Sequence, residues 1–417
     1  MNPTDTRRLA KHRSEVPVAI TGMGFHGAAG RHVNELQARF RAGQTAIRPL
    51  SLSERPEPSM GFGAFLDRDA IDAHLPSAFE SELTDRTIRT ADFTIRASAI
   101  AAIEAMGTAS IAPDRLGLVL GGSNVQHALL FSEFQRFYEN PSRINPRVGF
   151  EGLDTHLAAV IAMLIHAQGP VITVAAAAAS GLHAAITAMD LIRLGRCDAC
   201  LVIGAMQCPT LPEWRALGTL GALNLGEEAS VPLCEGGHGF TPGEAAACVL
   251  FEAQTHAVAR KARIHALGCG GAYVSAADPM PHASAEDEAR SMVLALNEAG
   301  LGIQDIDLVT LHATGTRQGD EAEISALQQV FAERLNAIWG FTPKSITGHC
   351  LTASGVVGLI ASILMLEEQR IYPVPLGGVP RITAPKLVAS SVAVPIVHTM
   401  TNAFGFGGFN ASLILRR

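Results

Sequence analysis

The sequence predicts a layered α/β protein built from two halves with a similar order of elements. At 417 residues the chain is too long for one ordinary hydrophobic core. Its 48% hydrophobic and 17% charged residues are typical of a compact α/β protein with tight helix–sheet contacts. Short apolar strands alternate with helical patterns in both parts of the chain. We therefore expect an N-terminal half at 16–252 and a C-terminal half at 263–417, joined by the segment between them.

Each half is expected to alternate between buried strands and covering helices. In the N-terminal half, apolar runs predict strands at 18–23, 116–122, 171–174, 199–204 and 245–252, and helical periodicity predicts helices at 32–42, 84–106, 128–138, 156–168, 181–194 and 253–261. In the C-terminal half, strands are expected at 263–273, 308–311, 344–346, 393–401 and 412–416, and helices at 285–299, 322–334 and 352–369. The region 210–239 is expected to be rich in loops. Buried strands between helices favour a layered architecture.

Composition and charge exclude several classes of function. A net charge of −7 argues against a general nucleic-acid binder. The cysteine count of seven is odd, and the residues are scattered, so no disulfide framework is expected. Cys197 and Cys200 lack a second ligand pair at zinc spacing, and no metal site is expected. Gly22–Gly27 has the spacing of a dinucleotide fingerprint, but no acidic residue follows at the required distance, so no nucleotide cofactor is expected.

No membrane or export segment is expected. The apolar run 356–366 is shorter than the roughly 20 residues that span a bilayer. Residues 1–15 are polar and carry four basic side chains without an apolar core, which is not the pattern of a secretory signal. We expect a cytoplasmic protein.

The stretch from Val171 to His183 is the one around which the rest of the chain is organised. It reads as an apolar strand, five alanines and then the start of a helix. A strand-to-helix elbow places a side chain at a helix N-terminus, where free N–H groups favour a developing anion. Nucleophiles often occupy such an elbow, yet only alanine stands at its tip. A buried, Ala-rich strand packed closely on a partner is the alternative interpretation of this stretch alone.

Three stretches of the C-terminal half place polar residues at the ends of apolar strands. The first, 311–323, carries His312 into a Gly/Thr loop and has Asp320 available to cap the following helix. The second, 344–349, has Lys344 at its start and His349 at its end. The third, 401–410, is rich in glycine and can turn tightly to direct N–H groups at a ligand. Each histidine alone could be a hydrogen-bonded core residue.

Together with the elbow, these stretches resemble the β-ketoacyl–acyl-carrier-protein synthases, the condensing enzymes of the thiolase-like fold. The resemblance runs from Val18 to the C-terminus. It implies a five-layer αβαβα fold from two duplicated halves and a homodimer formed partly by the elbow strand. It also implies that the substrates are malonyl or acyl thioesters carried by an acidic acyl carrier protein. The expected pathway is fatty acid or polyketide biosynthesis, and no cofactor is expected.

The resemblance also implies roles for particular residues. His312, in His-Ala-Thr-Gly-Thr, matches the first catalytic histidine of the family, although Ala313 stands where the family has glycine. His349 matches the second catalytic histidine, and Lys344 matches the site lysine. Asp320 and Glu323 match the acidic residues that support this region. Phe406 matches the gating aromatic residue whose backbone N–H joins the oxyanion hole, and Phe404 matches a second aromatic residue of the same loop.

The departures from the family pattern concern the chemistry directly. The nucleophilic cysteine position, two residues before Ser180, is occupied by Ala178. Ala178 cannot form an acyl-thioester, so the chain as written cannot complete a two-step condensation. Cys350 beside His349 lies on the wrong element to replace it. A family segment Arg-Asp-Gly-Phe reads Gly-His-Gly-Phe at 237–240, and Phe409 replaces a small polar residue.

Three functions remain open on the sequence. The chain could be a non-elongating member that decarboxylates malonyl-carrier protein, since by resemblance that step depends on the histidines. It could be the Cys-to-Ala form of a condensing enzyme. It could also be a non-catalytic partner subunit that shapes the chain-length tunnel of an active homologue, although such a subunit has no chemical need for intact histidines.

Overall fold

A computed structural model of the chain describes residues 16–235, 238–277, 282–377, 380 and 385–417. The expectations for residues 1–15 and for Gly237 lie outside this part of the chain.

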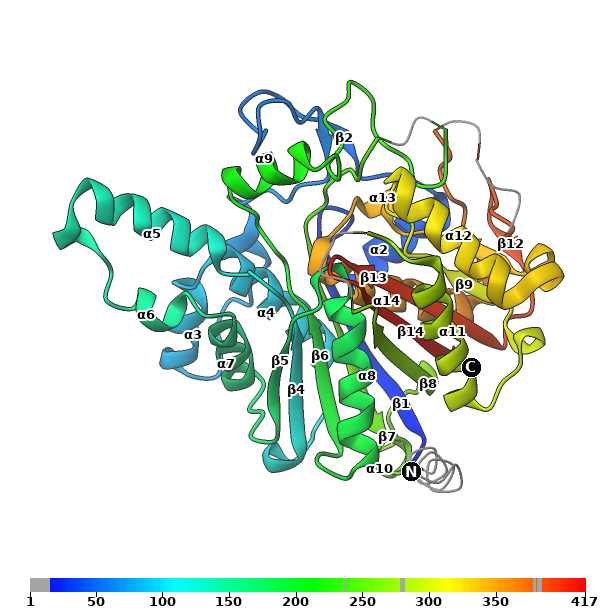
Figure 1. The fold of residues 1–417 in the computed structure, drawn as a ribbon. Helices are drawn as coiled ribbons and strands as arrows, with labels where there is room; N and C mark the ends of the chain where they lie inside the picture. Colours follow the sequence, from blue (N-terminus) through cyan, green and yellow to red (C-terminus); the bar gives the residue numbers. More distant parts are fainter. Residues whose placement is uncertain (1–15, 236–237, 278–281, 378–379, 381–384) are drawn as a thin grey trace.

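Ten strands form one hydrogen-bonded series that divides into two sets of five (Figure 1). The first set is β1 (Val18–Gly27), β4 (Leu116–Gly121), β5 (Val171–Val174), β6 (Ala199–Gly204) and β7 (Ala245–Ala253), in the order β5-β4-β6-β7-β1. The second set is β8 (Ala266–Ser275), β9 (Leu308–Thr310), β10 (Trp339–Phe341), β13 (His398–Gly405) and β14 (Phe409–Arg416), in the order β10-β9-β13-β14-β8. The sets meet where 18–20 of β1 pairs with 266–268 of β8.

The two sets repeat one pattern of strand pairing. In the first, β5, β4 and β6 are parallel, and β7 and β1 continue antiparallel. In the second, β10, β9 and β13 are parallel, and β14 and β8 continue antiparallel. The same order of pairs in both sets is what a duplicated fold requires.

Helices complete five layers. The central layer is α8 (Ser180–Arg193) and α14 (Ser354–Glu368), which contact each other and strands of both sets. The outer layers are α4 (Phe93–Met106) with α7 (Asp154–Leu164) on the first set, and α11 (Ala285–Ala299) with α12 (Arg317–Phe331) on the second. The αβαβα architecture expected from the family resemblance is thus the observed one (Figure 1).

The central position of α14 explains its composition. The segment Leu351–Glu368 is long and apolar enough to cross a membrane, and it is longer than the apolar run seen in the sequence. However, 83% of it is buried inside the protein. A helix packed between two sheets is hydrophobic on all sides because no face reaches water.

The remaining elements surround these layers. The helices are α2 (Val33–Ala42), α3 (Glu82–Arg89), α5 (His127–Glu139), α6 (Val148–Glu151), α9 (Leu211–Thr219), α10 (Gln254–Ala259) and α13 (Lys344–Thr347). Two pairs of two-residue strands are β2 (Arg48–Pro49) with β3 (Phe62–Gly63), and β11 (Arg370–Ile371) with β12 (Val392–Ala393).

Two predictions of local structure were wrong, and a third missed one helix. The strand expected at 344–346 is the one-turn helix α13, which follows Pro343. The single helix expected at 84–106 is two helices, because Asp92 caps a new helix with its side chain on the N–H of Thr94. The loop-rich region 210–239 contains α9, which begins with a capping box between Thr210 and Glu213.

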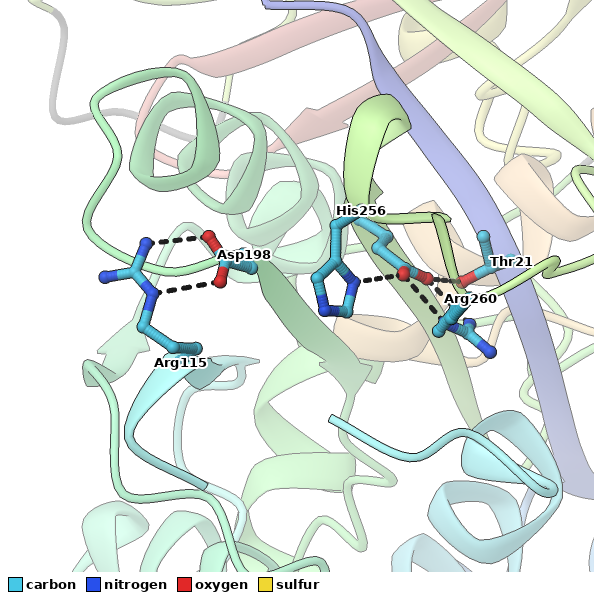
Figure 2. A network of polar contacts seen from close by, with 6 residues as sticks. Thr21, Arg115, Asp198, His256 and Arg260 are labelled. Atoms are coloured by element: carbon cyan, nitrogen blue, oxygen red, sulfur yellow. Dashed lines mark hydrogen bonds and ion pairs between the residues drawn. The ribbon is translucent and has the colours of Figure 1, made fainter. Parts of the chain in front are cut away.

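A buried carboxylate links strands and a helix near the junction of the two halves. Glu252 of β7 is fully buried and accepts hydrogen bonds from Thr21 of β1 at 2.8 Å and from Nε and Nη2 of Arg260 at 2.7 Å. His256 of α10 contacts it at 2.5 Å. Figure 2 shows these partners converging, with the separate Arg115–Asp198 ion pair beside them. Burial alone would raise the pKa of Glu252, but these hydrogen bonds hold it below the usual value.

We expect Glu252→Gln to lower the free energy of unfolding by about 2 kcal/mol at neutral pH, because it leaves Arg260 without its carboxylate. Since the folded-state pKa is depressed, the difference from the unmodified chain should shrink as pH falls below about 4. Urea denaturation measures both effects. Glu35→Gln, which removes an exposed ion pair with Arg31, is the control and should cost less than about 1 kcal/mol. Equal losses in the two variants would contradict the assignment.

Candidate active site

The elbow between β5 and α8 is a strained turn held by one serine. Ala177 has a φ of +48°, in the left-handed region that residues with a Cβ rarely adopt. Ser180 Oγ accepts from the N–H of Ala176 at 2.8 Å and donates to the carbonyl of Ala177 at 2.7 Å. Ala178, at the tip, lines a cavity at the N-terminal end of α8. The elbow therefore presents position 178 to the cavity, although alanine supplies no reactive atom there.

The glycine-rich loop packs directly on this elbow. A Cβ on Gly405, at the end of β13, would lie 2.4 Å from the carbonyl oxygen of Ala176. Phe404 and Phe406, on either side of this glycine, both line the cavity. Phe404 is buried, whereas 45% of the surface of Phe406 is exposed. The close contact at Gly405 thus places one buried and one accessible ring beside Ala178.

Two acidic residues of α12 hold the loop that carries His312. Glu323 accepts from the N–H groups of His312 at 2.8 Å and Ala313 at 2.7 Å. Asp320 accepts from the N–H groups of Thr314 at 2.9 Å and Gly315 at 3.0 Å. The N-cap of α12 is Thr316, so the expectation that Asp320 caps this helix was wrong. Asp320 lies in the first turn, and its carboxylate reaches back to the preceding loop.

Contacts of Lys344 determine which nitrogen of His312 carries the proton. Lys344 is buried in α13, and its Nζ donates to the carbonyl of His312 and lies 3.4 Å from Nδ1 of the same residue. An ammonium group can only donate, so Nδ1 of His312 is the acceptor. The neutral ring then carries its proton on Nε2.

His349 is fixed in the same tautomer by a different set of contacts. The N–H of Leu351 donates to His349 Nδ1 at 3.1 Å, and Ser354 Oγ lies 2.9 Å from that atom. Because a backbone N–H can only donate, Nδ1 is an acceptor and Nε2 is the protonated nitrogen. Ser354, the first residue of α14, is a supporting residue that the sequence analysis missed.

The two histidines face one another in one cavity. Their ring centroids are 5.9 Å apart with an interplanar angle of 86°. Phe404 packs on His312 at 5.6 Å, and Phe240 packs on His349 at 4.9 Å. The cavity, of about 770 Å³, is lined by both histidines and by Ala178, Phe404 and Phe406. Lys344, Asp320 and Glu323 are buried behind its wall, where they support the histidine loops.

Burial sets the protonation states of this group. It lowers the pKa of His312 and of His349 well below the usual value, and the nearby Lys344 charge lowers both further. Burial also lowers the pKa of Lys344 to about 8 and raises that of Glu323 to about 7. Both rings are therefore neutral at pH 7, and each directs an N–H donor, not a positive charge, at the cavity.

Four other residues singled out in the sequence, Cys197, Cys200, Cys350 and Phe409, are not among the residues that line the cavity. Cys350 is buried, burial raises the pKa of its thiol to about 12, and its Sγ contacts the carbonyls of Thr347 and Gly348. Such a thiol is a poor nucleophile. Phe409 is partly exposed, and its ring lies 6.3 Å from that of His183. Cys197 and Cys200 are both buried free cysteines.

This fold, and the arrangement of its cavity, are those expected for the thiolase-like class of proteins to which the condensing enzymes belong. Residues 15–257 match the family model "Beta-ketoacyl synthase, N-terminal domain" and residues 263–375 match "Beta-ketoacyl synthase, C-terminal domain". The chain belongs to the β-ketoacyl synthase family.

Relatives match along nearly the whole chain. The polyketide biosynthesis malonyl-ACP decarboxylase PksF of Bacillus subtilis is 29% identical over 409 residues, covering 96% of each chain. A putative polyketide β-ketoacyl synthase of Streptomyces halstedii is 30% identical, covering 95% of this chain and 97% of its own. Among solved structures, a β-ketoacyl synthase from Burkholderia phymatum superposes with a TM-score of 0.82 at 28% identity, covering 96% of this chain and 99% of its own.

We expect ¹⁵N NMR of histidine-labelled protein to show His312 and His349 as neutral rings protonated on Nε2 at pH 7. Neither should titrate near pH 6.5, because burial disfavours the charged form. Spectra of His312→Gln and His349→Gln assign the two signals. A ring protonated on Nδ1, or a midpoint near 6.5 for either residue, would contradict this arrangement.

Proposed function

We propose that this protein decarboxylates a malonyl thioester carried by an acyl carrier protein and releases an acetyl thioester without forming a carbon–carbon bond. The observation that carries the proposal is the pair of neutral Nε2–H donors that share a cavity with Ala178. The similarity to a protein named as a malonyl-ACP decarboxylase supports it.

The two donors suit the transition state of decarboxylation. As the carboxylate leaves as carbon dioxide, negative charge develops on the thioester oxygen, and two fixed N–H groups stabilise that enolate. Removing one preorganised donor of this kind typically costs about 3–4 kcal/mol in transition-state energy. A neutral imidazole also avoids a strong ion pair with the ground-state carboxylate, so its stabilisation is greater in the transition state. Position 178 would have to hold an acyl acceptor for condensation, and a methyl group cannot.

The buried charges behind the histidines favour an enzyme over a purely structural subunit. Replacing a buried ion pair by apolar residues is often neutral or stabilising, so packing alone gives little reason to bury Lys344 and Glu323. These charges fix the backbone and tautomer of His312. The Cys-to-Ala form of a condensing enzyme would catalyse the same decarboxylation, since it lacks only the atom at position 178 that holds the acyl group.

The carrier protein is proposed to dock at the mouth of the cavity. The rim includes α9 and the start of α12. Arg317 lies on the α12 side with 79% of its side chain exposed, and Arg215 lies on α9 with 63% exposed. Thr314 and Thr316 line the passage inward and can donate to the amides of a phosphopantetheine arm. Although Arg317 pairs with Glu321 and Arg215 pairs with Glu57 within the chain, both guanidinium groups are exposed, which suits an acidic partner despite the negative net charge.

We expect the protein to convert malonyl-carrier protein into acetyl-carrier protein and carbon dioxide. The intact mass of the carrier protein measures this conversion. His312→Ala or His349→Ala should slow this by roughly 10²-fold or more, because each removes one donor. Ala178→Cys should allow acylation at position 178 and, with an acyl donor, formation of a β-ketoacyl product.

Rising salt should lower kcat/KM for the carrier substrate more than for a malonyl-pantetheine fragment.

Cys350→Ala is the matched control, because its thiol does not line the cavity, and it should decarboxylate at the rate of the unmodified chain. If the unmodified chain makes no acetyl product and Ala178→Cys neither acylates nor condenses, the enzymatic proposal fails and the partner-subunit alternative replaces it.

We also propose a homodimer formed through the edge strand β5 and the segment 127–153. β5 ends the strand order, so one edge carries no neighbour in the described chain, and Val171 on it is 42% exposed. Helix α5 projects from the body of the protein in Figure 1. The segment 127–153 carries exposed apolar side chains: Phe134, Phe137, Tyr138, Ile144, Phe150 and Leu153. Exposed apolar surface of this kind is typical of an interface.

The solution mass measured by light scattering should be twice the 43.8 kDa of one chain. Val171→Lys should weaken the dimer by roughly tenfold or more, because a two-fold axis brings the introduced charges near each other. Val258→Lys, on exposed α10, is the control and should leave the mass unchanged. A mass near that of one chain for the unmodified protein would refute the dimer.

A further inference from the structure

Glu288 is a buried carboxyl on the wall of the active-site cavity that neither the histidines nor their supports use. It belongs to α11, has 1% of its surface exposed and lines the same cavity as Ala178, His312 and His349. Among the described residues, its Oε2 has no hydrogen-bond partner. A polar atom buried without a partner is costly, so its presence in a cavity points to a ligand.

The position of Glu288 follows from how α11 packs on β14. One turn along the helix, Ser291 Oγ lies 3.0 Å from Ser412 Oγ, and Ser412 in turn donates to Asn402 of β13 at 2.9 Å. Asn402 then donates to Glu323, at 3.3 Å. This chain of contacts joins α11 to the support of the His312 loop.

The surroundings favour the protonated form of Glu288. Burial raises its pKa well above the usual value, and the nearby carboxylates of Glu323 and Asp320 raise it further. The described structure gives it no ion pair or hydrogen bond that would offset these effects. A protonated carboxyl can donate a proton, and its lack of charge avoids repulsion of a malonyl carboxylate.

We propose that Glu288 is the general acid that protonates the enolate left by decarboxylation. The proposal rests on the proposed function and adds the step that a chain without an acyl acceptor requires. In a condensation, the enolate carbon attacks an acyl thioester. With Ala178 in place of the nucleophile, the same carbon must instead take a proton, and Glu288 is a carboxyl of the cavity wall whose Oε2 makes no hydrogen bond to the described residues.

The step balances without a further reagent. The bond between C2 and the malonyl carboxylate breaks, carbon dioxide leaves, and the electron pair moves into the thioester as an enolate held by the two histidine N–H groups. A C–H bond then forms at C2 as the O–H bond of Glu288 breaks. The carboxylate of Glu288 regains a proton from water. The sum is a malonyl thioester plus one proton giving an acetyl thioester and carbon dioxide.

The test measures how the enolate divides between protonation and recombination with carbon dioxide. Full-length protein is incubated with malonyl-carrier protein under ¹³C-labelled carbon dioxide, and mass spectrometry follows both label in the malonyl group and formation of acetyl product. In Glu288→Gln, which keeps the size of the side chain but cannot act as an acid, the ratio of label exchange to acetyl formation should rise by roughly 10²-fold. A residue that only supports packing would slow both processes together.

Controls separate the possible failures. Glu104→Gln alters another partly buried carboxyl with a raised pKa, located on α4 away from the cavity, and should leave the ratio unchanged. An unchanged ratio in Glu288→Gln, or loss of both processes in parallel, overturns the role of Glu288 while the decarboxylase function stands. If the unmodified chain releases no carbon dioxide, the proposed function itself fails.

Discussion

The site depends on the close approach of the two central helices at their N-terminal ends. A Cβ on Gly181 of α8 would lie 2.9 Å from Val356 Cγ2 of α14, and one on Gly355 would lie 2.7 Å from the backbone nitrogen of Leu182. Only glycine permits this contact without a shift of one helix. Since Ala178 lies just before α8 and His349 just before α14, the contact brings the nucleophile position and the second histidine to one cavity. Both helices direct their positive ends there, which favours an enolate.

Long elements could be predicted from the sequence, because their patterns reflect burial. The strand Ala199–Gly204 and the helix Ala285–Ala299 were predicted with the observed bounds. Short elements could not, because their structure depends on contacts from elsewhere. In the helical turn that Lys344 begins, its side chain donates to the carbonyl of His312 on a distant segment, and no local pattern predicts that contact. Helix α9 could have been found, since Thr210 and Glu213 have the spacing of a capping box.

Site residues divide in the same way. The resemblance named the histidines, and the structure brings them together with Ala178, but it was silent on Ser354 and Glu288. Ser354 has an ordinary interpretation as a residue at a helix start, and only its 2.9 Å contact with His349 identifies it as a support. For Glu288, the sequence did contain a pattern that could have identified it. It lies four residues before the buried Met292, on the face of α11 that also carries Ala295, so helical spacing places a carboxyl among core positions.

The loss of a nucleophile changes the fate of the enolate more than its formation. In the proposed mechanism, His312 and His349 donate to the thioester oxygen during decarboxylation, whether position 178 is cysteine or alanine. What differs is the next step, since an enolate without an electrophile either recaptures carbon dioxide or accepts a proton. The N–H group of a neutral imidazole is a very weak acid. A neutral carboxyl is a much stronger acid and can protonate an enolate. A chain with alanine at position 178 therefore gains most from a buried acid such as Glu288, and the cavity wall supplies one.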